Sequence, residues 1–247
     1  MHRYQILIEY VGTNFIGWQI QSKGQSVQKL IQIKISKLLK EKINLIGSGR
    51  TDSGVHAIEQ SAHFDCKKKI ENLSKFLQSI NYFLNIKLVS ILNIKKRSLN
   101  FHARFSAKQR IYKYIIFNRI SKPSIEKNRG WHIRKKLDLK LMKKGAKKLL
   151  GTNDFSTFRS SSCNAKSPIR TIKSIKIKEV KNKIQIQFKS QSFLQQQVRS
   201  MVGCLKYLAE KKWNLKKFER IFKSKKRTLN NAPLAPAHGL FLEKVIY

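Results

Sequence analysis

The sequence predicts an α+β protein, because strand-like runs and amphipathic helical patterns alternate twice along the chain. Residues 4–11 combine β-branched and aromatic side chains, as strands do. Residues 26–41 carry apolar side chains at helical spacing between lysines, with Ser26 as a good N-cap. Residues 171–190 alternate apolar and polar side chains on both sides of Lys181-Asn182, which predicts a hairpin.

The first round of alternation ends near residue 94. We expect strands at 4–11, 60–65 and 88–94 and helices at 26–41 and 72–84, and the apolar run 43–46 leads into the glycine-rich stretch. Strand, helix, strand, helix, strand is an α+β unit of about a hundred residues. The glycine-rich stretch 47–57 falls between elements, so we expect it to be exposed.

The second round fills the rest of the chain without visible sequence repetition. We expect a strand or strand pair at 105–118, helices at 139–150, 193–211 and 215–222, a loop at 154–167, hairpin strands at 171–180 and 183–190, and a strand at 239–246. No linker rich in Pro, Gly or Ser divides the halves. We place the domain boundary near 98–102, which gives an N-terminal domain at 1–100 and a C-terminal domain at 101–247.

Charge is the strongest compositional signal. The chain has 53 Lys and Arg against 13 Asp and Glu, a net charge of +40 spread over its whole length. Such a field attracts polyanions, and nucleic acid is the commonest partner. The chain is also rich in Ile and Asn, as A+T-biased coding would produce, so some lysines can be compositional drift.

Features that the chain lacks indicate its compartment and exclude several classes of function. Three distant cysteines argue against a disulfide framework, and no apolar run reaches the ~18 to 20 residues that span a bilayer. We therefore expect a cytoplasmic protein with no membrane association. The six histidines share no metal-ligand spacing, and the phosphate-loop and serine-nucleophile motifs are missing, so we expect no metal and no cofactor.

Residues 47–57, Gly-Ser-Gly-Arg-Thr-Asp-Ser-Gly-Val-His-Ala, form the clearest candidate site. Their three glycines permit positive φ and close approach of another molecule, and they place Arg50 beside Asp52. A carboxylate can attack carbon or take a proton. The alternative is a plain turn, with Asp52 capping nearby amides and Arg50 solvated.

Three further side chains are candidates outside that loop. Tyr112 shares a strand face with Tyr114, where a tyrosine can stack on a base or simply belong to the sheet core. Arg199 lies beside an apolar helical stripe, so it either snorkels to water or pairs with a buried carboxylate. Trp18 is expected in the core.

Residues 47–57 resemble the signature of the tRNA pseudouridine synthase A family, whose usual form is Gly-Ala-Gly-Arg-Thr-Asp-Ala-Gly-Val-His-Ala. The resemblance continues through nearly the whole chain in the family's order, in residues 12–19, 103–107, 112–114, 154–159, 198–203 and 235–240. Two departures are Val11, where many members have Asp, and the glutamines at 195–197, where a histidine-containing stretch is common. They affect details of tRNA contact and leave the reaction intact.

The resemblance implies a cofactor-free isomerase that converts uridine to pseudouridine at positions 38, 39 and 40 in the anticodon arm of tRNA. It implies that Asp52 is the catalytic nucleophile, that Arg199 pairs with it, that Tyr112 stacks on the flipped base, and that Arg50 helps to extrude the nucleotide. It also implies two α+β domains joined through a central antiparallel sheet with the active-site cleft between them, and a homodimer.

Two rival functions remain at this stage. A basic RNA chaperone with this fold but no turnover would have lost Asp52, Tyr112 or Arg199, and all three are present. A phosphate-recognising hydrolase built on the loop at 47–54 would show nucleotide turnover or metal dependence, and no other feature of the chain supports it.

Overall fold

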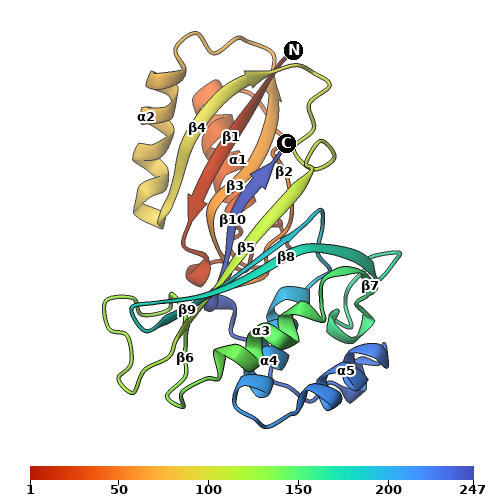
Figure 1. Ribbon diagram of the computed structural model, residues 1–247. Helices are drawn as coiled ribbons and strands as arrows, with labels where there is room; N and C mark the ends of the chain where they lie inside the picture. The colour runs from red at the N-terminus through yellow and green to blue at the C-terminus, as the bar shows by residue number, and fades with distance from the viewer. The chain divides into compact units, whose positions relative to one another are not determined.

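The computed structural model describes all 247 residues and has the mixed α+β architecture that the sequence predicts (Figure 1). The chain divides into two compact units. Unit 1 comprises residues 1–108 and 241–247, and unit 2 comprises residues 109–240. The first segment of unit 1 ends at Lys108, and the end of the chain, residues 241–247, belongs to unit 1 again. The domain bounds 1–100 and 101–247 stay a prediction.

Unit 1 is built on a sheet with the strand order β4-β1-β3-β10. Its strands are β1 (His2–Tyr10), β2 (Ile46–Gly47), β3 (His56–Cys66), β4 (Val89–Arg97) and β10 (Leu240–Ile246). β1 runs antiparallel to both β3 and β4, while β10 runs parallel to β3 through Phe241↔His56. The short β2 pairs with β3 further along, through Ile46↔His63.

The two helices of unit 1 begin where their caps predict. Ser26 accepts a hydrogen bond from the Lys29 N–H and starts α1 (Val27–Leu39), and Asn72 does the same for α2 (Leu73–Leu84). α1 ends at Lys40, whose φ of 51° is left-handed, so the helix is shorter than the expected 26–41. The helices pack on each other and α2 packs on β4, which buries Tyr4, Ile6 and Ile8 of β1.

The main strands of unit 2 follow the order β5-β9-β8-β7 and pair antiparallel. Its strands are β5 (Gln109–Phe117), β6 (Trp131–His132), β7 (Gly151–Asp154), β8 (Ile169–Val180) and β9 (Lys183–Ser190). The predicted hairpin is confirmed: β8 and β9 pair, and Lys181 and Asn182 both adopt positive φ at its turn. β6 and β7 were not expected from the sequence.

The helices of unit 2 are α3 (Leu139–Lys147), α4 (Gln197–Ala209) and α5 (Leu215–Lys223), which pack on one another. The helix expected at 193–211 begins four residues late. Gln196 takes a left-handed φ of 62°, and the Gln197 side chain accepts the Leu194 N–H at 2.8 Å, so residues 193–196 form a turn. No helix of the structure is long and apolar enough to cross a membrane.

Candidate functional site

The loop at 47–57 is held at its start by a buried glutamine of β3. Gln60 accepts a hydrogen bond from the Ser48 hydroxyl at 2.7 Å and donates one to the Gly49 carbonyl at 2.9 Å. The Trp18 indole lies over Gly47, where an added Cβ would come within 2.5 Å of its Nε1. Trp18 is a core residue, as expected, and it forms the floor of this loop.

The residue before Asp52 is fixed by the segment that follows β1. The Thr51 carbonyl accepts the Trp18 N–H at 3.1 Å, and its hydroxyl shares a 2.8 Å hydrogen bond with the Tyr10 hydroxyl. Gly17 crosses directly over this carbonyl with φ of 116°, a conformation in which a side chain would be strained. The backbone carrying Asp52 therefore lies in a defined position.

A second clamp closes the far side of the loop. The Asp52 carbonyl accepts the Val55 N–H at 3.1 Å, which forms the turn. Gly12 approaches so closely that an added Cβ would lie 1.9 Å from the Val55 carbonyl oxygen. Its N–H donates to Nδ1 of the buried His56 at 3.0 Å. Since Nδ1 accepts this bond, His56 supports the loop as a structural acceptor.

These clamps make the loop less exposed than its position between strands suggested. Thr51 and Val55 are buried, Asp52 is half-buried, and only Arg50 and Ser53 are exposed. The glycine contacts with the segment at 12–18 account for the difference, because that segment covers one side of the loop. A half-buried carboxylate on a rigid loop suits nucleophilic attack.

The tyrosines of β5 in unit 2 have different surroundings. Tyr114 is fully buried, donates its hydroxyl to the Pro236 carbonyl at 2.8 Å, and has its pKa raised by burial. Gly239 packs against its ring, since an added Cβ would lie 2.5 Å from it. Tyr114 thus belongs to the core. Tyr112 keeps a 9% exposed fraction and meets the Phe193 ring edge to face at 5.3 Å.

Arg199 lies half-buried on α4 and is hydrogen-bonded to Ala235, the residue before the Pro236 that accepts the Tyr114 hydroxyl. Its Nε donates to the Ala235 carbonyl at 2.8 Å, and the Ala235 N–H donates back to the Arg199 carbonyl at 3.3 Å. A guanidinium whose Nε is fixed in this way presents its two terminal nitrogens in a defined plane. Simple snorkelling into water does not describe this side chain.

The segment at 235–239, which the sequence shows only as a family motif, therefore connects two candidate residues of unit 2. It links the Tyr114 hydroxyl to Arg199 through adjacent residues, and it carries the half-buried His238. Burial and the positive charge of Arg199 lower the pKa of His238, which favours the neutral imidazole. The sequence feature that could have drawn attention to this segment is Pro236 followed three residues later by Gly239, a pair typical of a loop.

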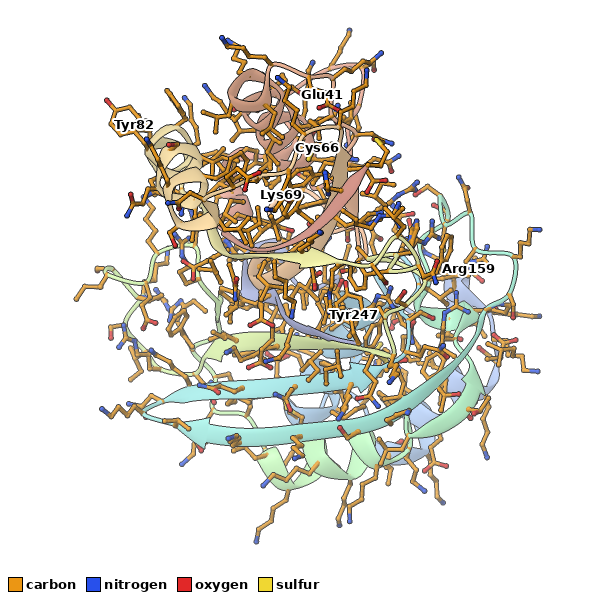
Figure 2. The ribbon with its side chains drawn as sticks, turned by 90° about the horizontal axis from the view of Figure 1, so that it is seen from above. Glu41, Cys66, Lys69, Tyr82, Arg159 and Tyr247 are labelled. Atoms are coloured by element: carbon orange, nitrogen blue, oxygen red, sulfur yellow. The ribbon has the colours of Figure 1, made fainter.

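Cysteines and metal-binding side chains take no part in either arrangement. Cys66, which Figure 2 labels, Cys163 and Cys204 are buried free thiols, and burial raises the pKa of Cys66 to about 11. The structure holds no group of three or more His, Cys, Asp or Glu side chains that could bind a metal ion.

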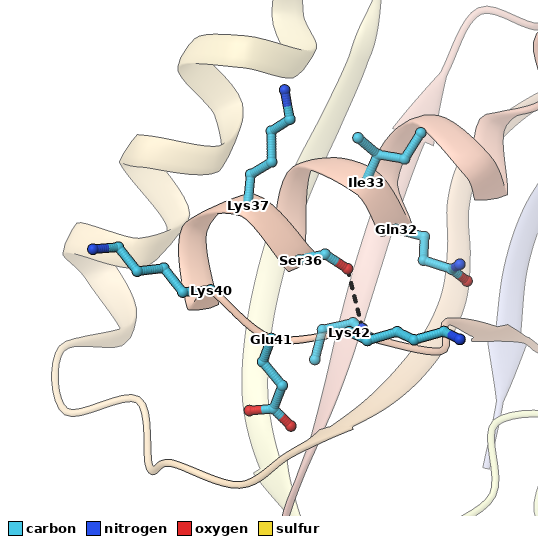
Figure 3. Close-up of a pocket in the computed structure, with 8 residues that line it drawn as sticks. Gln32, Ile33, Ser36, Lys37, Lys40, Glu41 and Lys42 are labelled. Atoms are coloured by element: carbon cyan, nitrogen blue, oxygen red, sulfur yellow. Dashed lines mark hydrogen bonds between the residues drawn. The ribbon is translucent and has the colours of Figure 1, made fainter.

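The hollow at the end of α1 is a different kind of feature (Figure 3). Lys37, Lys40 and Lys42 are among its lining residues, and the Ser36 hydroxyl in its wall accepts the Ile43 N–H at 3.1 Å. The Glu41 carboxylate is engaged by the Lys67 N–H at 3.0 Å. Since the Ser36 hydroxyl and the Glu41 carboxylate both accept backbone N–H groups, the lysines are the groups of this hollow that suit contacts with phosphate.

Comparison with known proteins adds a family to this geometry. A family model described as tRNA pseudouridine synthase matches residues 6–106 and 146–247. A protein of Pelagibacter ubique (strain HTCC1062) named tRNA pseudouridine synthase A is 77% identical over 247 residues, which cover 100% of both chains. One of the same name from Paramagnetospirillum magneticum (strain ATCC 700264 / AMB-1) is 41% identical over 247 residues, covering 100% of this chain and 96% of that protein.

Proposed function

Because the chain belongs to the tRNA pseudouridine synthase family, we propose that it isomerises uridines in the anticodon arm of tRNA with Asp52 as its nucleophile. The family makes it an isomerase that converts uridine in tRNA to pseudouridine. The reaction breaks the N1–C1′ bond, turns the base, and joins C5 to C1′. A proton leaves C5 and N1 gains one, so no oxidant or cofactor is required.

The observation that carries the Asp52 assignment is the local support of its loop. Two glycines, Gly12 and Gly17, approach the backbone on either side of Asp52 at distances that leave no room for a side chain. Such a fixed, half-buried carboxylate can attack carbon without first being ordered, which is how pre-organised groups accelerate reactions. A plain surface turn would not need this support.

The other site residues take the roles that the family resemblance implies. In this proposal Arg199 pairs with the Asp52 carboxylate, Tyr112 stacks on the uracil ring and helps to move a proton, and Arg50 fills the place of the extruded nucleotide. The fixed Nε of Arg199 supports its role, whereas the buried Tyr112 ring lies against Phe193 and takes its role from the family resemblance alone. Extruding a base costs a few kcal/mol of stacking, which contacts between a basic surface and phosphates can offset.

The finer assignments concern substrate, assembly and compartment. We place the modified uridines at positions 38, 39 and 40, the protein in the cytoplasm as a homodimer, and its tRNA binding largely on phosphate contacts. The net charge of +40 supports the last assignment, and three buried free thiols suit a reducing compartment. Light scattering on a sizing column tests the dimer, and a flat dependence of tRNA affinity on salt would contradict the phosphate contacts.

The central test measures tritium released from tRNA labelled at C5 of uridine, with wild type, Asp52→Ala and Asp138→Asn. Asp138→Asn is the matched control. The Asp138 carboxylate caps α3 by accepting the Leu141 N–H, and an asparagine side chain caps a helix equally well. We expect release by wild type and Asp138→Asn, and none by Asp52→Ala, with tRNA affinity preserved within a few-fold. Release by Asp52→Ala would overturn the nucleophile, and tight binding without release by wild type would favour an RNA-binding protein.

A further inference from the structure

Residues 98–108 follow β4 and complete the first segment of unit 1. They include the family motif at 103–107, to which the proposed reaction gives no role. They cover a polar face of the unit 1 sheet, where Gln5, Ser61 and His63 are buried. Gln5 donates to the Ser61 hydroxyl at 2.8 Å and accepts from Arg97 at 2.9 Å. This face is therefore satisfied by hydrogen bonds and not by apolar packing.

Arg3 anchors the first part of the segment. It forms a bidentate pair with Asp65, with both N···O distances 2.7 Å. Its NH1 donates to the Phe101 carbonyl at 2.7 Å and also to the Leu99 carbonyl. A planar guanidinium that serves a carboxylate and two carbonyls fixes the backbone at both residues.

Ala103 is the second anchor. Its N–H donates to Nδ1 of His63 at 3.1 Å, and its carbonyl accepts the Tyr247 hydroxyl at 2.8 Å (Figure 2). The Tyr247 ring also lies 4.9 Å from the ring of Phe101. Ala103 has no exposed surface, so the backbone is fixed two residues before Phe105.

The tip itself, residues 102–106, is closed by His102. Its Nδ1 accepts the N–H groups of Arg104 and Phe105 at 3.2 and 3.3 Å. Its carbonyl accepts the Ser106 N–H at 2.9 Å, and its own N–H donates to the Ser106 hydroxyl at 3.0 Å. A neutral imidazole is required for Nδ1 to accept, and burial lowers the pKa of His102 accordingly.

This rigid tip presents an aromatic ring to solvent. Phe105 is 76% exposed, its ring lies 4.4 Å from the His102 ring, and the guanidinium of Arg104 lies 5.6 Å from its centroid. Ordering a loop and leaving a phenylalanine in water both cost free energy. An aromatic ring beside an arginine on a fixed backbone is the arrangement that stacks on an unpaired base near a phosphate.

We propose that Phe105 is a stacking platform for an unpaired base of the RNA substrate. The segment is anchored at Ser61 and His63, on the part of β3 that also pairs with β2 at the start of the Asp52 loop. The proposal rests on tRNA being the substrate, and it assigns Phe105 a binding contact with an unpaired base.

The test compares full-length Phe105→Ala, Phe105→Leu, Phe105→Trp and Tyr82→Ala for affinity to unmodified tRNA. Tyr82 is a matched control, because it is 75% exposed on α2 of the same unit and projects into solvent (Figure 2). We expect Phe105→Ala and Phe105→Leu to weaken binding by about 5- to 100-fold and to raise KM with kcat unchanged. Phe105→Trp and Tyr82→Ala should bind like wild type.

Three outcomes would overturn the platform: wild-type affinity in Phe105→Ala, wild-type affinity in Phe105→Leu, or equal losses in Phe105→Ala and Tyr82→Ala. Urea unfolding of each variant separates a lost contact from a damaged fold, and a tip residue this exposed should leave stability unchanged. Affinity is measured without turnover. A wild type that binds through Phe105 but releases no tritium would contradict the proposed reaction while leaving the platform standing.

Discussion

Unit 1 and unit 2 fix their proposed site residues in two different ways. Asp52 lies on a loop whose backbone is held by the close approach of Gly12 and Gly17, so its position depends on the absence of side chains elsewhere. Arg199 lies on helix α4 and is aimed by a hydrogen bond from its own Nε to Ala235. The loop arrangement is sensitive to added volume, whereas the helix arrangement is sensitive to lost hydrogen bonds.

The largest effects should come from added volume. Gly12→Ala in unit 1 and Gly203→Ala in unit 2 each bring a Cβ within 1.9 Å of a backbone carbonyl oxygen, of Val55 and Pro233 respectively. We expect each to lower the free energy of unfolding by about 3 kcal/mol or more, because backbone has to move. Urea unfolding measures the loss. Wild-type stability in either variant would show that the neighbouring segment yields easily.

Removing one hydroxyl should distinguish an effect on the orientation of Arg199 from an effect on the stability of the protein. Tyr114→Phe deletes the hydrogen bond to Pro236, and we expect it to cost about 1–3 kcal/mol of stability and to lower kcat with KM unchanged. Tyr4→Phe is the matched control, since the buried Tyr4 hydroxyl accepts the Ile70 N–H at 2.9 Å in unit 1. It should lose similar stability and keep kcat. Equal kcat in both variants would mean that residues 235–239 do not aim Arg199.

The polar face of unit 1 predicts a dependence on pH. Burial and the charge of Arg3 lower the pKa of His63 from 6.5 to about 4. As pH falls, the unfolded chain binds the proton first, so the contribution is present above pH 6.5 and is lost as pH falls toward 4. Between pH 7 and pH 5 we expect wild type to lose about 1–2 kcal/mol more than His63→Asn in urea unfolding. Equal losses would show that His63 stays accessible to protons.

The smallest effects should be equal in the two units. Ser26→Ala removes the acceptor for the Lys29 N–H in α1, and Asp138→Ala removes the acceptor for the Leu141 N–H in α3. Each should cost about 1 kcal/mol and leave kcat unchanged, because helix caps act locally. Thermal unfolding measures the cost. A change in tritium release with either variant would connect that helix to the site.

Local patterns were sufficient for most of the fold. The Ser26 cap, the periodicity of α2 and α5, and the hairpin at Lys181-Asn182 are short-range signals, and the structure confirms them. Boundaries failed where side chains bond to the backbone. β5 begins at Gln109 instead of 105 because His102 and its neighbours form the closed tip, and β7 exists only by pairing with β8.

The sequence indicates the candidate site residues but not the contacts that support them, for the same reason. Asp52 stands out because three glycines surround it in sequence, and Arg199 because it lies in an apolar helix. The supports were invisible, because Gly12, Trp18 and Gln60 reach the Asp52 loop only after the strands have paired. Likewise, Tyr114 and Pro236 are 122 residues apart in sequence, so no local pattern could predict their hydrogen bond.

The course of the chain through unit 1 has a consequence for biosynthesis. The edge of β3 that receives Phe241 and Leu242 is made early, but about 130 residues of unit 2 are translated before its parallel neighbour β10 emerges. At ribosomal rates this interval is on the order of ten seconds. Nascent unit 1 therefore leaves the ribosome with an open strand edge, and without the Tyr247 hydroxyl that ties Ser61 to Ala103. During that interval the strong positive charge of the chain opposes pairing of this edge with other copies of the nascent chain.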